Sequence, residues 1–314
     1  MLYLLNMVLL QQRYHDQCEW YQYTTLKEHF FYSVLPEGQG APWKRKYPDN
    51  VIFIMKKDIP WGKIDIGIAT DLDFFKMLLD HNIPAVFHID QMPPNETEKN
   101  KHIIELNGHI TLYWSSEEAT QWGAGISIIR PHPIDTNRFK GYRGILKEAI
   151  TVATRPIGQW PREMKGYDIL KKAYPQIPIQ VIAGKDSEFP NSKQIMTEEE
   201  MIWHMANYSL YFNCGFKLDR TPLEAMAVGM PVFAIRHRFN AYKDMFNENT
   251  MNIAYFDTAD KMIEGAQLYL RPDNFYMLRA LGEAAQKTIK EHFNPVISIS
   301  QWNKAFNLAI KNHK

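Results

Sequence analysis

Two cations in the second half of the chain have the type and spacing to hold a diphosphate. Arg155 follows the apolar run 149–154, and Lys165 stands ten residues later, directly before Gly166. The run predicts a strand and the segment after Gly166 predicts a helix, so both cations belong to one strand-to-helix connection. Two cations in such a connection can neutralise a diphosphate. Single lysines and arginines are mostly solvated surface charges, so this interpretation depends on the surrounding pattern.

The stretch 221–234, which reads TPLEAMAVGMPVFA, predicts a helix whose first turn could bind phosphate. Thr221 is a good N-cap residue, Pro222 suits the first helical position, and Glu224 stands where a capping box needs it. Gly229 ends the predicted helix, and the apolar run after it predicts a buried parallel strand. A helix N-terminus offers unpaired backbone N–H groups and the positive end of the helix dipole, which both favour a phosphate.

The pair Asp71 and Asp73 allows two interpretations. As a D-x-D motif it could bind a divalent metal that bridges a diphosphate. However, Thr70 directly before it is a typical N-cap, and the helix dipole favours acids in the first turn. We prefer the capping interpretation, and the sequence predicts no metal site.

These residues need an α/β framework to bring them together. The first half of the chain alternates short apolar runs with helical patterns, as a parallel sheet covered by helices does. The predicted strands are 2–8, 51–55, 64–69, 85–88, 110–114 and 127–129. The predicted helices are 16–29, 71–81, 99–107 and 117–121, and the Gly/Pro/basic segment 35–50 is predicted to be a loop.

A second α/β series follows a break in composition at 137–146, where basic residues and two glycines come together. Its predicted strands are 149–154, 179–183, 210–212, 232–235 and 251–256, and its further helices are 166–174, 197–207, 258–270, 273–292 and 298–312. The sequence therefore predicts a first domain at 1–142, a second at 143–296 and a C-terminal helix at 297–314.

The composition is that of a soluble globular protein, with 45% hydrophobic and 23% charged residues among 314. The net charge of +1 argues against a dedicated nucleic-acid-binding protein, although 44–46 is a local basic cluster. The cysteines, Cys18 and Cys214, have no metal-ligand spacing, so a reduced, cytoplasmic location is expected. The apolar run 1–10 is too short to span a bilayer and is predicted to be a buried strand.

The order of four motifs resembles the donor domain of a known enzyme family. The motifs are R-x9-K-G, V-I-A-G, M-I-W-H-M-A-N-Y-S-L-Y-F-N and T-P-L-E-A-M-A-V-G-M-P-V-F-A. Together they resemble the retaining GT-B glycosyltransferases, the family that includes sucrose-phosphate synthases and bacterial mannosyltransferases. Weaker matches are Y-W-S-S-E-E, S-I-I-R-P-H-P-I-D-T-N-R-F and the terminal helix with Trp302. The resemblance implies two Rossmann-like domains facing a cleft and a C-terminal helix that crosses back to the first.

The resemblance also implies roles for residues of the second half. Arg155 and Lys165 match the pair that grips the diphosphate and stabilises its charge as it leaves. Glu224 matches the carboxylate that accepts hydrogen bonds from the ribose hydroxyls. The backbone of the three residues Thr221, Pro222 and Leu223 would face the donor phosphates, and Gly184 and Lys185 would border the nucleoside. From its sequence context alone, Gly184 is equally plausible as an ordinary turn glycine.

In the first half, His88 stands where many members keep a histidine near the transferred sugar, although a histidine after a strand is more often a partly buried polar residue. The family's second glutamate, eight positions before the one matched by Glu224, is missing, because Phe216 or, with a shifted alignment, Cys214 takes its place. Asp219 is the nearby carboxylate that could substitute. The usual glycine-rich loop after the first strand is also replaced, by the segment 11–13, which reads QQR.

The resemblance predicts transfer of a sugar from a nucleotide-diphosphate sugar, with UDP or GDP as the carrier, to an acceptor hydroxyl, with retention and without a metal or other cofactor. The acceptor would be a saccharide, a lipid-linked glycan or, against the near-neutral charge, DNA, and the protein would be cytoplasmic or peripheral to a membrane. Two alternatives stay open. One is a nucleotide-sugar-binding protein that has lost the chemistry, and the other is a glycosyltransferase that modifies DNA bases.

Overall fold

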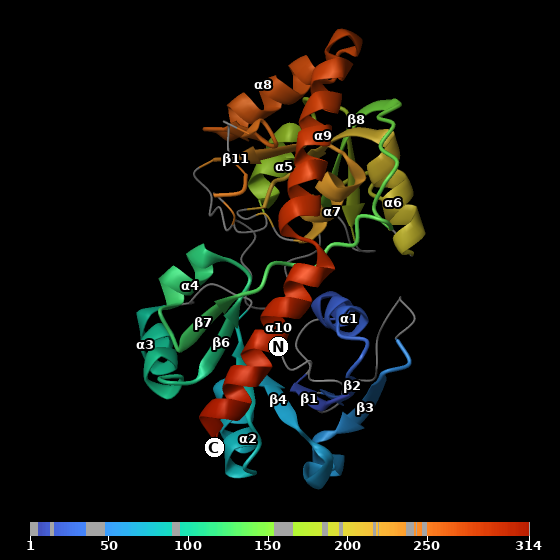
Figure 1. The fold of residues 1–314 in the computed structure, drawn as a ribbon. Helices are drawn as coiled ribbons and strands as arrows, with labels where there is room; N and C mark the ends of the chain where they lie inside the picture. Colours follow the sequence, from blue (N-terminus) through green and yellow to red (C-terminus); the bar gives the residue numbers. More distant parts are fainter. Residues whose placement is uncertain are drawn as a thin grey trace. The chain divides into compact units, whose positions relative to one another are not determined.

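The computed structural model describes residues 6–12, 16–35, 48–89, 95–153, 166–183, 188–194, 197–215, 218, 220–236, 242, 244–246 and 250–313. The chain forms two compact units (Figure 1). The first unit contains Met1–Pro133 and Pro295–Lys314, and the second contains Ile134–Asn294. The C-terminal segment thus belongs to the first unit.

The first unit is built on a parallel sheet of seven strands in the order β3-β2-β1-β4-β5-β6-β7. The strands are β1 Val8–Gln12, β2 Phe30–Leu35, β3 Val51–Met55, β4 Ile66–Ala69, β5 Ala85–His88, β6 Ile110–Tyr113 and β7 Ile126–Ile129. Every residue of β4, β5 and β6 is buried, as in parallel strands that helices cover on both faces.

Helices cover both faces of this sheet. They are α1 Asp16–Thr25, α2 Leu72–Asp80, α3 Glu96–Glu105, α4 Ser116–Trp122 and α10 Pro295–His313, with short 3₁₀ turns at Lys56–Asp58 and Trp61–Lys63. Side chains of α2, α3 and α4 pack into one apolar cluster, and those of α1 and α10 pack into another on the opposite face. The resemblance predicted that the C-terminal helix returns to the first domain, and the packing of α10 on β5, β6 and β7 confirms this.

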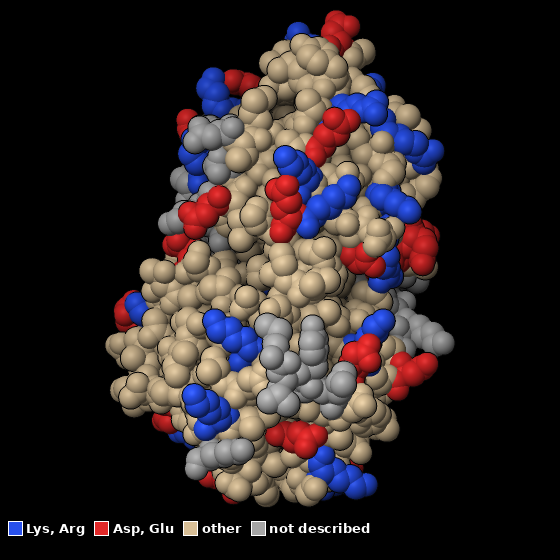
Figure 2. Space-filling model, viewed as in Figure 1, with Lys and Arg blue, Asp and Glu red and all other residues tan. Residues whose placement is uncertain are grey.

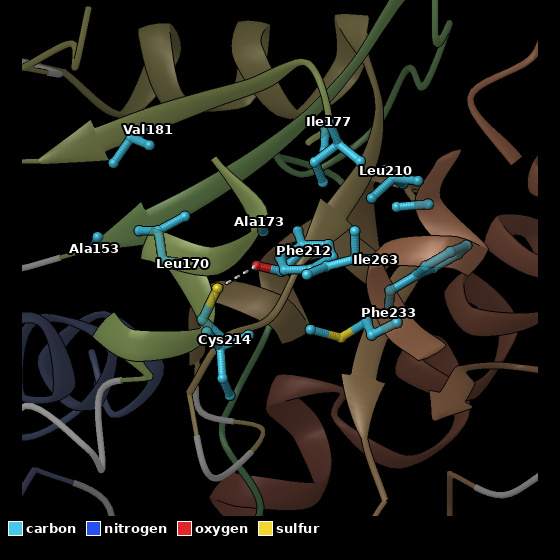
Figure 3. Close-up of a cluster of buried hydrophobic side chains, with 14 of the residues drawn as sticks. Ala153, Leu170, Ala173, Ile177, Val181, Leu210, Phe212, Cys214, Phe233 and Ile263 are labelled. Atoms are coloured by element: carbon cyan, nitrogen blue, oxygen red, sulfur yellow. Dashed lines mark hydrogen bonds between the residues drawn. The ribbon is translucent and has the colours of Figure 1, made fainter. Parts of the chain in front are cut away.

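The second unit has a parallel sheet of five strands in the order β12-β11-β10-β8-β9. The strands are β8 Leu146–Ala153, β9 Ile179–Ala183, β10 Tyr208–Phe212, β11 Val232–Ile235 and β12 Ala254–Phe256. The helices are α5 Tyr167–Ala173, α6 Glu198–Asn207, α7 Arg220–Val228, α8 Ala259–Tyr269 and α9 Phe275–His292, with a 3₁₀ turn at Pro272–Asn274. Figure 3 shows Leu170 of α5 and Ile263 of α8 in the apolar cluster around Phe212 of β10.

Two local predictions for the first unit are wrong. The first strand was expected at 2–8, but β1 begins at Val8 and runs to Gln12; residues 1–5 lie outside the described part of the chain. The helix expected at 16–29 ends at Thr25, and β2 follows where no strand was predicted. Sequence reasoning missed β2 because Ser33 interrupts its apolar run, yet Ser33 is buried and accepts a hydrogen bond from the Tyr23 hydroxyl at 2.9 Å.

The boundary between the units falls at Pro133 and Ile134, before the break in composition at 137–146. The segment after the boundary packs on the second unit. Its Tyr142 hydroxyl donates to the Ser209 carbonyl at 2.6 Å, and the Arg143 N–H donates to the Ala206 carbonyl at 2.7 Å. The glycines and basic residues of this segment therefore lie in a connection that is held in place on its own unit.

Candidate functional site

The order of the second sheet reverses between β8 and β10, so that α5 and α7 leave neighbouring strands at the same edge. Ligands of open α/β sheets bind at such a switch point, outside the carboxyl ends of the strands. The predicted cations and the TPLEAMA stretch belong to the two connections that start at this edge. The strand order therefore places α5 and α7, which are far apart in sequence, after two neighbouring strands.

Gly166 holds the start of α5 against the residue that follows β10. Its φ of +70° is in the left-handed region, and a Cβ at this position would lie 1.8 Å from the carbonyl oxygen of Cys214. No side chain fits there. The contact with Cys214 therefore explains why the residue after Lys165 is a glycine. Lys165 itself, Arg155, Gly184, Lys185 and Asp219 lie outside the described residues.

The start of α7 corrects the predicted capping box. The helix begins at Arg220, so Thr221 is its second residue and does not cap it. An earlier start is compatible with Pro222, because a proline without N–H costs nothing among the first residues of a helix, whose N–H groups have no partner in the helix. Glu224 is consequently the fifth residue of α7. Its burial therefore needs an explanation other than a capping bond to Thr221.

Glu224 is only 5% exposed, although carboxylates are seldom buried without partners. Leu223 and Pro222 are also buried, and Thr221 is half-buried. Arg220, which sequence reasoning missed, is 7% exposed and stands four residues before Glu224, a spacing that places both side chains on one face of the helix. The sequence did contain a signal for Arg220, namely a basic residue four positions before an acidic one in a predicted helix. The edge of the second sheet thus carries a buried cation and a buried anion.

Cys214, one of the residues that replaces the family's glutamate, faces the apolar interior. It is 4% exposed, and its thiol donates to the Phe212 carbonyl at 3.8 Å (Figure 3). Phe216, the other replacement, lies outside the described residues. At the position of Cys214 the side chain is therefore part of the core and offers no carboxylate to a sugar.

In the first unit, His88 is part of a buried polar cluster at the carboxyl ends of β5, β6 and β7. Val86, Leu112 and Ile128 of these strands face the cluster that contains α10. Because side chains alternate along a strand, the residues two positions later face the same side. Those residues are His88, Trp114 and Arg130, and each of them is at most 3% exposed.

Ring contacts and one hydrogen bond organise this cluster. The Arg130 guanidinium carbon lies 3.8 Å from the centroid of the Trp114 ring and 4.8 Å from that of Trp302 in α10. Arg130 Nη2 lies 3.1 Å from His88 Nε2, and His132 stacks on Trp114 with centroids 3.7 Å apart. Burial, and secondarily the charge of Arg130, lower the pKa of His88 well below its ordinary value of 6.5. His88 is therefore neutral near pH 7.

The first sheet has its own switch point, between β1 and β4, and Gln12 occupies it. The Gln12 side-chain oxygen accepts from the backbone N–H groups of Thr70 and Asp71 at 3.0 and 3.1 Å, and its amide donates to the Asp71 carboxylate. Asp71 caps α2 by accepting from the Phe74 N–H at 2.7 Å. The predicted capping role of this motif is confirmed, but the N-cap is Asp71, not Thr70. Across the described part of the chain, no group of three or more His, Cys, Asp or Glu side chains could hold a metal.

Gln11 lies beside Gln12 but enters the interior of the first unit, where it donates to the Gln22 side-chain oxygen at 3.3 Å. Both side chains are at most 1% exposed. The two glutamines of this segment thus have different roles. Gln12 forms hydrogen bonds with the start of α2, and Gln11 forms a hydrogen bond between β1 and α1. Arg13 lies outside the described residues.

Among the described helices, none combines the length and the apolar character that crossing a bilayer would require. Figure 2 shows acidic and basic side chains interspersed on the visible face of each unit. This distribution agrees with the net charge of +1 and provides no broad basic surface on that face.

Neither a protein-family model nor a curated protein matches this sequence. Solved structures match it in fold over almost the whole chain. A glycosyltransferase from Rickettsia africae ESF-5 superposes with a TM-score of 0.71 at 13% identity, covering 98% of this chain and 99% of that one. The E. coli trehalose-6-phosphate protein bound with UDP-2-fluoro glucose gives 0.63 at 9% identity, with 96% and 99% covered.

A third similar structure is the lipopolysaccharide outer core galactosyltransferase WaaB in its apo form, with a TM-score of 0.58, 12% identity, and 96% and 99% of the two chains covered. At these identities the likeness concerns the fold. In this chain the fold consists of two parallel-sheet units, with a C-terminal helix that returns to the first. The chain has the GT-B fold of glycosyltransferases.

Proposed function

We propose that this protein transfers a sugar from a nucleoside-diphosphate sugar to an acceptor hydroxyl. The observation that carries the proposal is the contact of Gly166 with Cys214, which holds the start of α5 against the connection that leads into α7. This contact joins the chain directly after Lys165 to the chain that leads to Glu224. A diphosphate at this edge would meet a cation and a helix N-terminus, and the ribose would meet a carboxylate.

The chemical requirement is stabilisation of the leaving nucleoside diphosphate. Arg155, Lys165 and the first turn of α7, which contains Thr221, would oppose the negative charge that develops on it, without a metal. Gly184 and Lys185 would border the nucleoside, and Asp219 would take the place of the missing glutamate. Retention at the anomeric carbon and a contact between His88 and the transferred sugar complete the proposal. The GT-B fold and the order of the sequence motifs support it.

A screen of donors tests the proposal first. UDP-, GDP-, ADP- and dTDP-glucose are added separately, and the melting temperature is measured, because a ligand that binds only the folded state raises it. One similar structure is bound with UDP-2-fluoro glucose, so UDP-glucose is the first candidate. We expect a rise with one nucleotide carrier and none with free glucose. Absence of a rise with every donor would contradict the proposal.

The second test concerns the cations. Lys165→Ala should lower turnover of the donor by roughly 100-fold or more, because one such cation contributes a few kcal/mol to the barrier. The matched control is Lys171→Ala in α5, whose side chain is 52% exposed and pairs with Glu188 at 3.1 Å. Equal turnover in the wild type and Lys165→Ala would refute the role of Lys165.

One observation favours a second candidate, a protein that binds nucleotide sugars without transferring them. Cys214 replaces a family glutamate in one alignment, and it is buried among apolar side chains. Titration calorimetry with the donor found in the screen separates the candidates. Binding with neither hydrolysis nor transfer over long incubation would support this second function.

A further inference from the structure

The buried arginine of the first unit is fixed between two indole rings. Arg130 is 1% exposed, and its guanidinium carbon lies within 5 Å of the ring centroids of Trp114 and Trp302, at 3.8 and 4.8 Å. Trp114 is itself covered by His132, whose ring stacks on it nearly in parallel, at 19°. Two cation–π contacts inside a packed layer allow the guanidinium little freedom to turn. Its N–H groups therefore keep a fixed direction.

One of these N–H groups determines the tautomer of His88. Arginine offers only donors and stays protonated in proteins, so at 3.1 Å the Arg130 Nη2 donates and the His88 Nε2 accepts. An accepting Nε2 carries no proton. A neutral imidazole has one proton, which must then be on Nδ1. The geometry thus allows only one of the two neutral tautomers.

Neighbouring rings hold His88 in this orientation. Trp114 meets the imidazole edge-to-face at 4.9 Å, and Trp302 lies tilted against it at 6.2 Å. These contacts come from three separate elements, since His88 ends β5, Trp114 follows β6 and Trp302 is in α10. In the described part of the chain, the charged or titratable groups around these rings are Arg130, which follows β7, His132, which stacks on Trp114, and Glu118, whose carboxylate accepts from the Trp114 backbone N–H at 3.1 Å.

We propose that Arg130 is a positioning residue that keeps His88 as a neutral imidazole with its proton on Nδ1. In this state Nε2 is occupied, so His88 cannot act as a general base through it, and the ring can act on a ligand only as a hydrogen-bond donor through Nδ1. The acceptor would be a hydroxyl oxygen, and this part of the inference rests on the proposed function. The C-terminal helix α10 contributes to this positioning because its Trp302 packs against the Arg130 guanidinium.

Nuclear magnetic resonance tests the tautomer without any ligand. Protein with ¹⁵N-labelled histidine is titrated from pH 8 to pH 5, and His88 is assigned by its loss in His88→Gln. In the wild type we expect an unprotonated Nε2 and a protonated Nδ1 at pH 8, and we expect this state to persist to a pH well below 6.5, because burial lowers the pKa of His88. A protonated Nε2, or a mixture of tautomers in the wild type, would overturn the proposal.

Two variants separate positioning from mere packing. Arg130→Met keeps apolar contact with both rings but cannot donate, so His88 should populate both tautomers and bind protons at higher pH. Arg130→Lys keeps a charged donor and should restore the Nδ1 tautomer at least in part. The control is Arg279→Met in α9, where Arg279 is 67% exposed and pairs with Glu283. An unchanged His88 spectrum in folded Arg130→Met would refute the role of Arg130.

The functional measurement uses UDP-glucose as the probe. Arg130→Met should lower kcat for its turnover at least about tenfold, because a His88 that leaves the Nδ1 tautomer no longer donates a hydrogen bond to the hydroxyl oxygen. The dissociation constant of UDP should stay within about twofold, because the proposed nucleotide site belongs to the second unit. A kcat equal to that of the wild type would refute the positioning role. Wild-type protein that binds no UDP would instead refute the proposed function and leave the tautomer result standing.

Discussion

The Cα of Gly166 approaches the backbone of Cys214 so closely that a methyl group on it would lie 1.8 Å from the Cys214 carbonyl oxygen. The two residues lie at the carboxyl edge of neighbouring strands, since α5 follows β8 and Cys214 follows β10. The contact sets how the start of α5 and the connection to α7 lie against one another. It is the structural reason why a glycine follows Lys165.

Gly166→Ala should destabilise the second unit strongly. The left-handed conformation costs an L-residue about 1 to 2 kcal/mol, and displacement of the Cys214 backbone adds to this, for a total of about 3 kcal/mol or more. The control is Gly141→Ala in the same unit, where φ is also positive, at +92°, but nothing lies within 4 Å of the added methyl group. Urea unfolding should show the larger loss for Gly166→Ala. Equal losses would mean that the contact with Cys214 is not the limiting constraint.

The sequence predicts an element correctly where the residues that determine its bounds lie next to it in the chain. The strand Val232–Ile235 is where the pattern placed it, because Gly229 and Pro231 act on their immediate neighbours. The start of α7 was misplaced because Thr221 and Pro222 suit several positions of a first turn. The contact of Arg130 with Trp302 could not be predicted. The two residues are 172 positions apart and meet only because α10 returns to the first sheet beside β7.

Asp71→Ala should lower the free energy of unfolding of the first unit by about 1 kcal/mol, because Asp71 caps α2 and accepts from Gln12. Asp73→Ala, at an exposed position in the first turn of the same helix, should change it by no more than about 0.5 kcal/mol. Urea unfolding of both variants measures the difference.

Turnover of the donor by the wild type should also survive EDTA, because the proposed mechanism uses no metal. Loss of turnover in EDTA together with equal defects in both variants would point to a metal site.

The stability of the first unit should fall in acid because of His88. Burial lowers the pKa of His88 in the folded state, so below pH 6.5 the unfolded chain binds a proton that the folded chain does not. The free energy of unfolding therefore falls as the pH decreases through 6.5, by up to about 1.4 kcal/mol per pH unit for this group. His88→Gln keeps an acceptor for Arg130 but cannot titrate, so its stability should fall less steeply.

Urea unfolding at pH 7.5, 6.5 and 5.5 measures this slope in both proteins. The exposed His292→Gln serves as the control and should retain the slope of the wild type. Parallel slopes for the wild type and His88→Gln would show that His88 does not protonate on unfolding in this range.

Glu224→Gln should weaken the binding of UDP roughly tenfold. Glu224 is buried in α7, and in our proposal its carboxylate accepts hydrogen bonds from the ribose hydroxyls. A neutral amide oxygen accepts less strongly, and a loss of about 1.4 kcal/mol is tenfold in the dissociation constant. The control is the exposed Glu283→Gln in α9.

To show that the effect belongs to the ribose, calorimetry compares the binding of UDP with that of 2′,3′-dideoxy-UDP to the wild type and to Glu224→Gln. The wild type should prefer UDP and the variant should lose most of that preference, because the two changes remove the same interaction. If Glu224→Gln weakens both nucleotides equally, Glu224 acts on the fold of α7 and the assignment to the ribose is wrong.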